Sequence, residues 1–167
     1  SKTYATFKIV DTLDPVYTPA YNQTVVCDGA GNVDQFQVWL DDNAAATAKE
    51  LHSAIRMLLK SVELEGDLCE EPQSIQPGAL NLTDRLFSLL NSMDIDAKSL
   101  GFNTLEYAKL GELFYRCGHL EWARLSYQAA IEKSPGHTAS LSSLTHLAKQ
   151  EGNVELQLDW IEKMIDR

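Results

Sequence analysis

The chain has 167 residues, 44% of them hydrophobic and 23% charged, which is the composition of an ordinary globular protein. Its 24 acidic and 14 basic residues give a formal net charge of −10, which argues against a nucleic-acid phosphate backbone as partner. No window reaches the roughly 18 consecutive apolar residues of a membrane span, and the start of the sequence has no secretory-signal pattern. A membrane or a nucleic acid is therefore not expected as a partner.

Cysteine usage indicates a reducing compartment. Cys27, Cys69 and Cys117 are odd in number and widely spaced, without a CxxC pair. We interpret them as reduced, mostly buried thiols, and one disulfide with one remaining thiol is the alternative. The expected location is the cytoplasm.

Residues 1–66 mix strand and helix patterns. Residues 6–10 are short and β-branched, and residues 24–27 and 33–40 flank a glycine-containing turn, as in a β-hairpin. Helix formers fill residues 44–64, after the capping residues 41–43. Their apolar stripe comprises Leu51, Ile55, Leu58, Leu59 and Val62. These patterns predict a small α+β region, in which one long helix ending near Gly66 covers an antiparallel sheet of about three strands.

A linker separates this region from the rest of the chain. Residues 65–79 hold two prolines, two glycines and four acids without an apolar period, so we predict an acidic linker over 67–79. Leucines at 82, 86, 89 and 90 then mark a capping helix over 80–92. This helix opens the predicted all-helical domain, residues 80–167.

The C-terminal part carries a helix–turn–helix pattern that starts at Thr104. Asn103 and Glu106 form a capping pair before the first helix. Small residues stand where two antiparallel helices must approach closely, a glycine ends the first helix, and a proline ends the second. The residues expected to form this repeat are Tyr107, Leu110, Gly111, Phe114, Gly118, Ala123, Tyr127, Ala130 and Pro135.

This register resembles the tetratricopeptide repeat, a 34-residue helix–turn–helix unit, with Tyr107 in place of the usual tryptophan. The same pattern recurs 34 residues later in a degenerate form. Gly152 stands at the position equivalent to Gly118, and Thr145 and Gln157 stand where the first repeat has small residues. The resemblance covers a strong repeat over 104–137 and a weak one over 138–167. The N-terminal region resembles no family that we recognise. The expected fold class is thus α+β, a small sheet and helix followed by a helical hairpin array.

The resemblance implies a concave face, lined by the first helix of each repeat, on which members of the family hold peptides or partner helices. The matching positions are Leu105, Ala108, Glu112, Tyr115 and Arg116 in the first repeat and Ala139, Ser142, His146 and Lys149 in the second. Family members that bind the acidic C-termini of chaperones use a clamp of Lys, Asn and Arg. Ala108, Glu112, Ala139 and Ser143 occupy those positions here, so this specificity is not expected.

No group of side chains indicates catalysis, a metal ion or a cofactor. The histidines, at 52, 119, 137 and 146, are scattered without zinc-ligand spacing. Cys117 and His119 are two residues apart, which points them away from each other at a helix end. The glycines at 29 and 31 lack the strand–loop–helix context of a phosphate loop. We therefore expect no enzyme, and no catalytic, metal or cofactor site.

The sequence predicts a non-enzymatic protein–protein interaction module, an adaptor or assembly factor that holds another protein or peptide in its groove. A secretion or folding chaperone of the same repeat type is one alternative, although such chaperones are all-helical with three repeats. A self-assembling structural protein is the other. Two repeats are fewer than the roughly three that usually bury a continuous core. The helix over 80–92, stacked on the first repeat as a cap, would supply the missing cover, and a homo-oligomer is the alternative.

Overall fold

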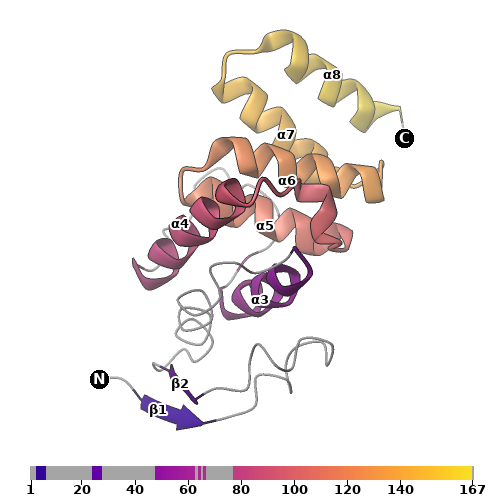
Figure 1. The fold of residues 1–167 in the computed structure, drawn as a ribbon. Coiled ribbons are helices and arrows are strands. Elements are labelled where there is room, and N and C mark those ends of the chain that lie inside the picture. Colours follow the sequence, from indigo (N-terminus) through magenta and orange to yellow (C-terminus); the bar gives the residue numbers. More distant parts are fainter. Residues whose placement is uncertain are drawn as a thin grey trace. The chain divides into compact units, whose positions relative to one another are not determined.

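The computed structural model describes residues 3–6, 24–27, 48–62, 64, 66 and 77–166. The chain divides into two compact units, whose helices and strands are labelled in Figure 1. The first comprises Ser1–Glu63 and Gln76–Leu100, and the second comprises Leu64–Ile75 and Gly101–Arg167. The predicted strand over 33–40 and most of the predicted linker lie outside the described residues.

The described residues of the first unit form one strand pair, two α-helices and a short 3-10 helix. Strands β1 (Thr3–Thr6) and β2 (Thr24–Cys27) are antiparallel, with Thr3 opposite Cys27. Helix α3 (Ala48–Ser61) contacts the 3-10 helix η3 (Ala97–Leu100). Four members of the predicted stripe on α3 are buried, namely Leu51, Ile55, Leu58 and Leu59. This part of the helix prediction is confirmed.

Helix α4 (Pro77–Ser92) begins three residues before the predicted start at 80. Proline is well suited to the first position of a helix, because the amide hydrogen that it lacks would have no partner there. Leu82, Leu86 and Leu90 form the buried face of α4. The helix ends where Asp94 adopts a positive φ of 51° and Ile95 N–H donates to the Leu90 carbonyl over 3.2 Å.

The expected α+β fold class is wrong. The described residues form six α-helices, and their only β structure is one ladder of two four-residue strands. That ladder is not a three-stranded sheet with a helix over it, and a lone pair of strands is too small to support a core. The described part of the chain is mainly α-helical, and the leucine stripes of α3 and α4 are buried.

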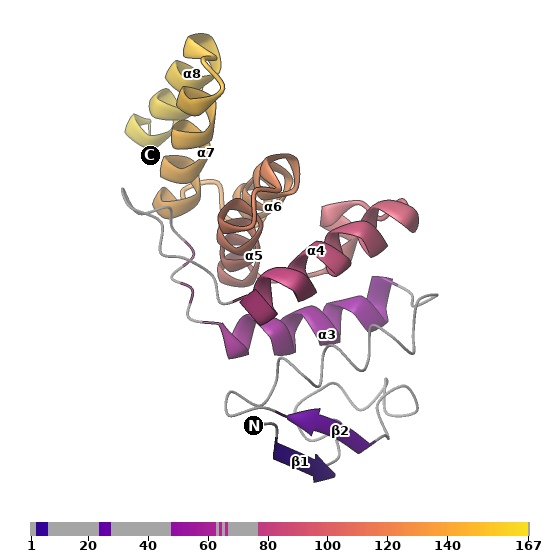
Figure 2. The ribbon, with the colours of Figure 1, turned by 90° about the vertical axis from the view of Figure 1, so that its left-hand side faces the viewer.

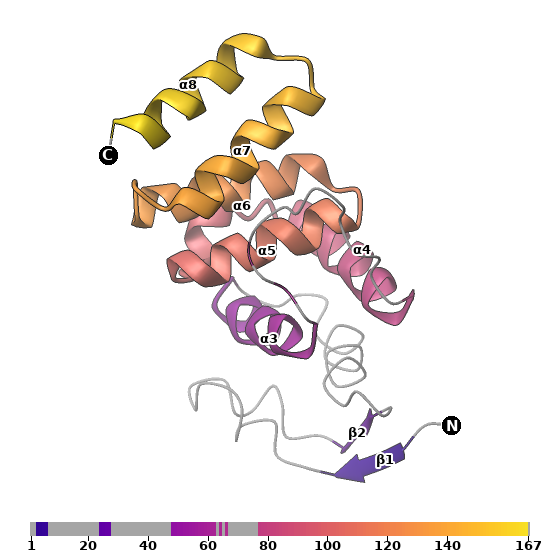
Figure 3. The same cartoon turned by 180° about the vertical axis from the view of Figure 1, so that it is seen from behind.

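The described residues of the second unit form an array of four helices, α5 (Thr104–Arg116), α6 (Leu120–Lys133), α7 (Thr138–Gln150) and α8 (Val154–Ile165). Each helix packs on the next one along the chain, and the short connections are visible in Figures 2 and 3. The first residues of α5 and α7 are 34 positions apart, and so are those of α6 and α8. The array therefore repeats its helical hairpin with a period of 34 residues.

Both hairpins turn on a glycine. Gly118 and Gly152 have φ angles of +83° and +71°, and a Cβ on either would meet no atom within 4 Å. The following amides close the turn, His119 N–H onto Phe114 O and Asn153 N–H onto Ala148 O, each over 2.9 Å. This is the glycine-terminated helix end of the Schellman type, so backbone conformation alone demands glycine there.

The predicted capping pair before α5 is confirmed. The Asn103 side chain accepts the Glu106 N–H over 2.8 Å, and the Glu106 carboxylate accepts the Asn103 N–H over 3.2 Å. A histidine caps α7 instead, because His137 Nδ1 accepts the Ser140 N–H over 3.3 Å and lies 2.7 Å from Ser140 Oγ. Side chains thus satisfy amides that the first turn of each helix leaves without an intrahelical partner.

Aromatic side chains fill the first hairpin. The ring of Tyr107 packs edge-on against Phe102 at 5.5 Å between centroids, and its hydroxyl accepts the Gly101 N–H. The ring centroids of Phe114 and Trp122 are 5.6 Å apart, and Trp122 is 4% exposed. In the second hairpin Trp160 is 8% exposed, with Lys163 Nζ 4.5 Å from its ring centroid. Each hairpin therefore holds one tryptophan.

Candidate functional site

The candidate site is the surface on α5 and α7 to which the repeat register assigns the concave positions, called here the α5–α7 face. Helix α5 supplies Leu105, Ala108, Glu112, Tyr115 and Arg116, and α7 supplies Ala139, Ser142, His146 and Lys149. These positions recur every three or four residues, so they lie along one side of each helix. In the structure these residues fall into two groups. One is a polar junction around Tyr115 and His146, and the other is a covered part of α5 around Glu112.

The polar junction joins the two hairpins. The Tyr115 and His146 rings meet edge to face, with centroids 5.9 Å apart and planes at 72°. Tyr115 Oη lies 3.3 Å from His146 Nε2 and accepts a 2.7 Å hydrogen bond from Gln150 Nε2. The structure thereby brings together two predicted site residues that are 31 positions apart, and adds Gln150 from the last turn of α7.

The covered part lies on α5 around Glu112, which is 1% exposed. Glu112 Oε1 accepts the backbone N–H of Gly66 over 2.7 Å, and Oε2 contacts the guanidinium of Arg116 one helical turn away. A buried carboxylate is costly unless it is paired and hydrogen-bonded, and both conditions are met here. Glu112 therefore faces the chain itself, where the sequence predicted a position open to a partner.

Gly66 also closes over the small residue beside Glu112. A Cβ built on Gly66 would lie 3.2 Å from Ala108 Cβ and 3.4 Å from Leu105 Cδ1, and its φ is +80°. Ala108 is fully buried, whereas Leu105 is 49% exposed. At the other end of the face, Ser142 and Lys149 are exposed, and His146 is half-buried. The accessible part of the α5–α7 face is thus mostly on α7.

The residues assigned to the repeat core fall into two groups. The buried ones are Tyr107, Leu110, Gly111, Phe114, Ala123, Tyr127 and Ala130, and the exposed ones, both in turns, are Gly118 and Pro135.

Two residues of this site were not predicted from the sequence: Gly66 and Gln150. Gly66 was assigned only the role of a helix stop, and its contact with Glu112 spans 46 positions. A signal for a buried role was nonetheless present, since Glu112 follows Ala108 by one helical turn and precedes Arg116 by another. A carboxylate between a small residue and a cation on one helix side suits an enclosed ion pair.

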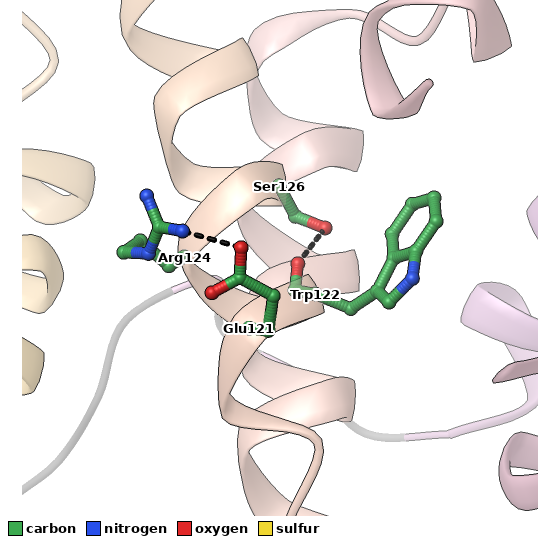
Figure 4. A network of polar contacts seen from close by, with 4 residues as sticks. All are labelled: Glu121, Trp122, Arg124 and Ser126. Carbon is green, nitrogen blue, oxygen red and sulfur yellow. Dashed lines mark hydrogen bonds and ion pairs between the residues drawn. The ribbon is translucent and has the colours of Figure 1, made fainter. Parts of the chain in front are cut away.

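Several other polar contacts of the described residues lie within a single helix. Figure 4 shows Arg124 paired with Glu121, and Ser126 Oγ donating over 2.7 Å to the Trp122 carbonyl, all within α6. Cys117 is the half-buried C-cap residue of α5. No cluster of three potential metal ligands occurs within the described ranges. Among the helices that the structure describes, none has the length and apolarity to cross a membrane.

Comparison with known proteins gives no match: no protein-family model, no curated protein and no solved structure is similar to this chain at a significant level.

Proposed function

We propose that the chain is a non-enzymatic protein–protein interaction module of the tetratricopeptide type, an adaptor or assembly factor that holds a partner protein or peptide on the α5–α7 face. The proposal places it in the cytoplasm, with no cofactor. The net charge of −10 favours a protein partner over a nucleic acid.

The observation that carries this proposal is the polar junction between hairpins that repeat every 34 residues. Tyr115, His146 and Gln150 link the first helices of the two hairpins. Exposed Ser142 and Lys149 stand beside them on α7. A donor-rich strip between two helices suits the carbonyl and carboxylate oxygens of a bound peptide.

A pair of charge reversals tests the proposal. Lys149→Glu changes the α5–α7 face, whereas Lys133→Glu makes the same change at an exposed site at the end of α6. The tagged chain is used to capture partners from cells of its source, and size exclusion with light scattering gives the stoichiometry. We expect a one-to-one partner that Lys149→Glu loses and Lys133→Glu keeps. A partner that responds equally to both changes would contradict the assignment of the face.

Self-association is the second candidate, favoured by apolar exposure on the last helix. Val154, Leu158 and Ile165 of α8 are 65%, 55% and 74% exposed. A second copy of the chain that covered α8 would remove these apolar side chains from water, which is favourable. Light scattering should then give a mass that rises with concentration, and Leu158→Glu should return it to the monomer. A concentration-independent monomer would exclude this candidate.

A further inference from the structure

Helix α8 presents an apolar stripe to solvent. The helix packs on α7 (Figure 2), and the residue that it buries is Trp160. The stripe lies along another side of α8, at spacings of four, three and four residues, and comprises Val154, Leu158, Ile161 and Ile165. Three of these side chains are more than half exposed, and Ile161 is half-buried. This spacing is that of the a and d positions through which one helix packs on another, so the stripe suits a further helix.

A row of acidic residues accompanies the stripe. Each apolar residue of the stripe is followed directly by an exposed acid, and these acids are Glu155, Asp159, Glu162 and Asp166. Successive residues lie about 100° apart around a helix, so the row borders the stripe along its whole length. Lys163, the basic residue of α8, is directed elsewhere, with Nζ 4.5 Å from the ring centroid of Trp160. The exposed surface of α8 thus combines an apolar stripe with negative charge along one flank.

The stability of α8 itself does not account for the end of this row. Glu162 lies in the last turn of the helix, and Asp166 is its C-cap residue. Negative charge is unfavourable there, because it adds to the negative end of the helix dipole. A cation brought beside these two carboxylates by a partner would offset this cost.

The acidic row distinguishes one kind of partner helix from another. Residues that flank the seam of two paired helices face each other and set the choice of partner. A second copy of α8 would bring Glu155 against Glu162 in an antiparallel pair, and uncharged Gln157 against Glu162 in a parallel pair. Neither arrangement supplies a cation. A helix whose apolar seam is flanked by lysine or arginine supplies one in both.

We propose that the outer face of α8 is a docking site for a basic amphipathic helix of another protein. The apolar stripe would pack into the seam of that helix, and the acidic row would pair with its lysine or arginine side chains. Burial of the stripe contributes the affinity, whereas the charges select the partner and speed its association. This surface is separate from the α5–α7 face, so the inference goes beyond the proposed function and does not depend on it.

Two synthetic peptides of about three heptads, each labelled with a fluorophore, provide the probes. Both carry leucine at the a and d positions, and the flanking e and g positions are lysine in one peptide and glutamate in the other. We expect the lysine peptide to bind the chain at least about ten times more tightly than the glutamate peptide, by fluorescence anisotropy. Leu158→Glu should abolish binding of the lysine peptide, because it places a charge within the seam.

A double charge reversal tests the acidic row. Glu155→Lys with Glu162→Lys should exchange the preference, so that the glutamate peptide binds more tightly. The matched control is Glu121→Lys with Glu132→Lys, which reverses two exposed acids of α6 and changes the net charge equally. This control should keep the preference for the lysine peptide.

Equal losses of lysine-peptide binding in the two double variants would mean that the peptide responds only to the net negative charge, and would overturn the proposal. Binding that survives Leu158→Glu would overturn it as well. So would a dimer, detected by light scattering, that Leu158→Glu dissociates and excess lysine peptide does not, because a second copy would then occupy the face. Ile165→Glu, at a 74% exposed position, replaces Leu158→Glu if circular dichroism shows that the latter does not fold.

The outcome is independent of the proposed function. Loss of a partner on Lys149→Glu reports on the α5–α7 face, whereas the peptide preference reports on α8. A partner that depends on Lys149, together with failure of both peptides to bind, would remove the α8 inference alone.

Discussion

Gly111 on α5 lies directly against the ring of Tyr127 on α6. A Cβ at Gly111 would come within 2.8 Å of both Cε2 and Cζ of that ring, closer than real side chains approach. Tyr127 is fully buried, so its ring has little room to move away. The distance between the two helices of the first hairpin is therefore set by the absence of a side chain at position 111.

Gly111→Leu should lower the free energy of unfolding by about 1–3 kcal/mol, because the added side chain forces the ring or the helix to shift. Urea denaturation followed by circular dichroism measures this change. Lys133→Leu, at an exposed position of α6, should change stability by less than about 0.5 kcal/mol. An unchanged stability in Gly111→Leu would show that α5 and α6 do not approach at this point.

Two glutamate–arginine pairs among the described residues of the array should differ in their contribution to stability. Glu112 and Arg116 are nearly buried, with side-chain exposures of 1% and 8%, whereas those of Glu121 and Arg124 are 66% and 29%. Glu112→Ala leaves Arg116 desolvated without a counter-charge and should cost about 3–5 kcal/mol. Glu121→Ala should cost no more than about 1 kcal/mol. Chemical denaturation of the two variants gives the comparison, and equal losses would contradict the burial of Glu112.

The junction between the hairpins should be measurable as a coupling energy. Tyr115→Phe removes the hydroxyl that accepts from Gln150 and lies beside His146, which should cost about 0.5–1.5 kcal/mol. A double-mutant cycle of Tyr115→Phe with Gln150→Ala isolates their interaction. We expect the two changes to be less than additive. Strict additivity would mean that the hydroxyl and the amide do not interact in solution.

The N-terminus of α7 depends on an unusual cap. His137→Ala removes the acceptor of the Ser140 N–H and should cost about 0.5–2 kcal/mol, as for other lost N-caps. His137→Asn supplies a side-chain oxygen suited to the same position and should retain or raise stability. Thermal unfolding monitored by circular dichroism distinguishes the two variants. The cap would have no role if both melted at the temperature of the unmodified chain.

The helices could be predicted because their signals are local. Asn103 with Glu106, and the turn glycines Gly118 and Gly152, act within a few residues of the helix ends that they determine. Residues close to each helix end were therefore sufficient to predict the bounds of α5 and its neighbours.

The prediction of the fold class was wrong because strand formation depends on a partner strand that is distant in the sequence. Whether an alternating run becomes a strand depends on pairing with another strand, and the described strands extend over only four residues each. The cover over Glu112 escaped prediction for the same reason. Nothing around Gly66 in the sequence indicates a contact 46 positions away.

The chain contains three tryptophans, and Trp122 and Trp160 stand in different hairpins with different surroundings. Trp122 lies beside Phe114, whereas Trp160 lies under the ammonium group of Lys163. With Trp39 replaced by phenylalanine, removal of either remaining indole leaves an intrinsic fluorescence reporter for a single hairpin. Coincident melting curves from the two reporters would define the array as one cooperative block, and an earlier transition at Trp160 would identify the C-terminal hairpin as the part that opens first.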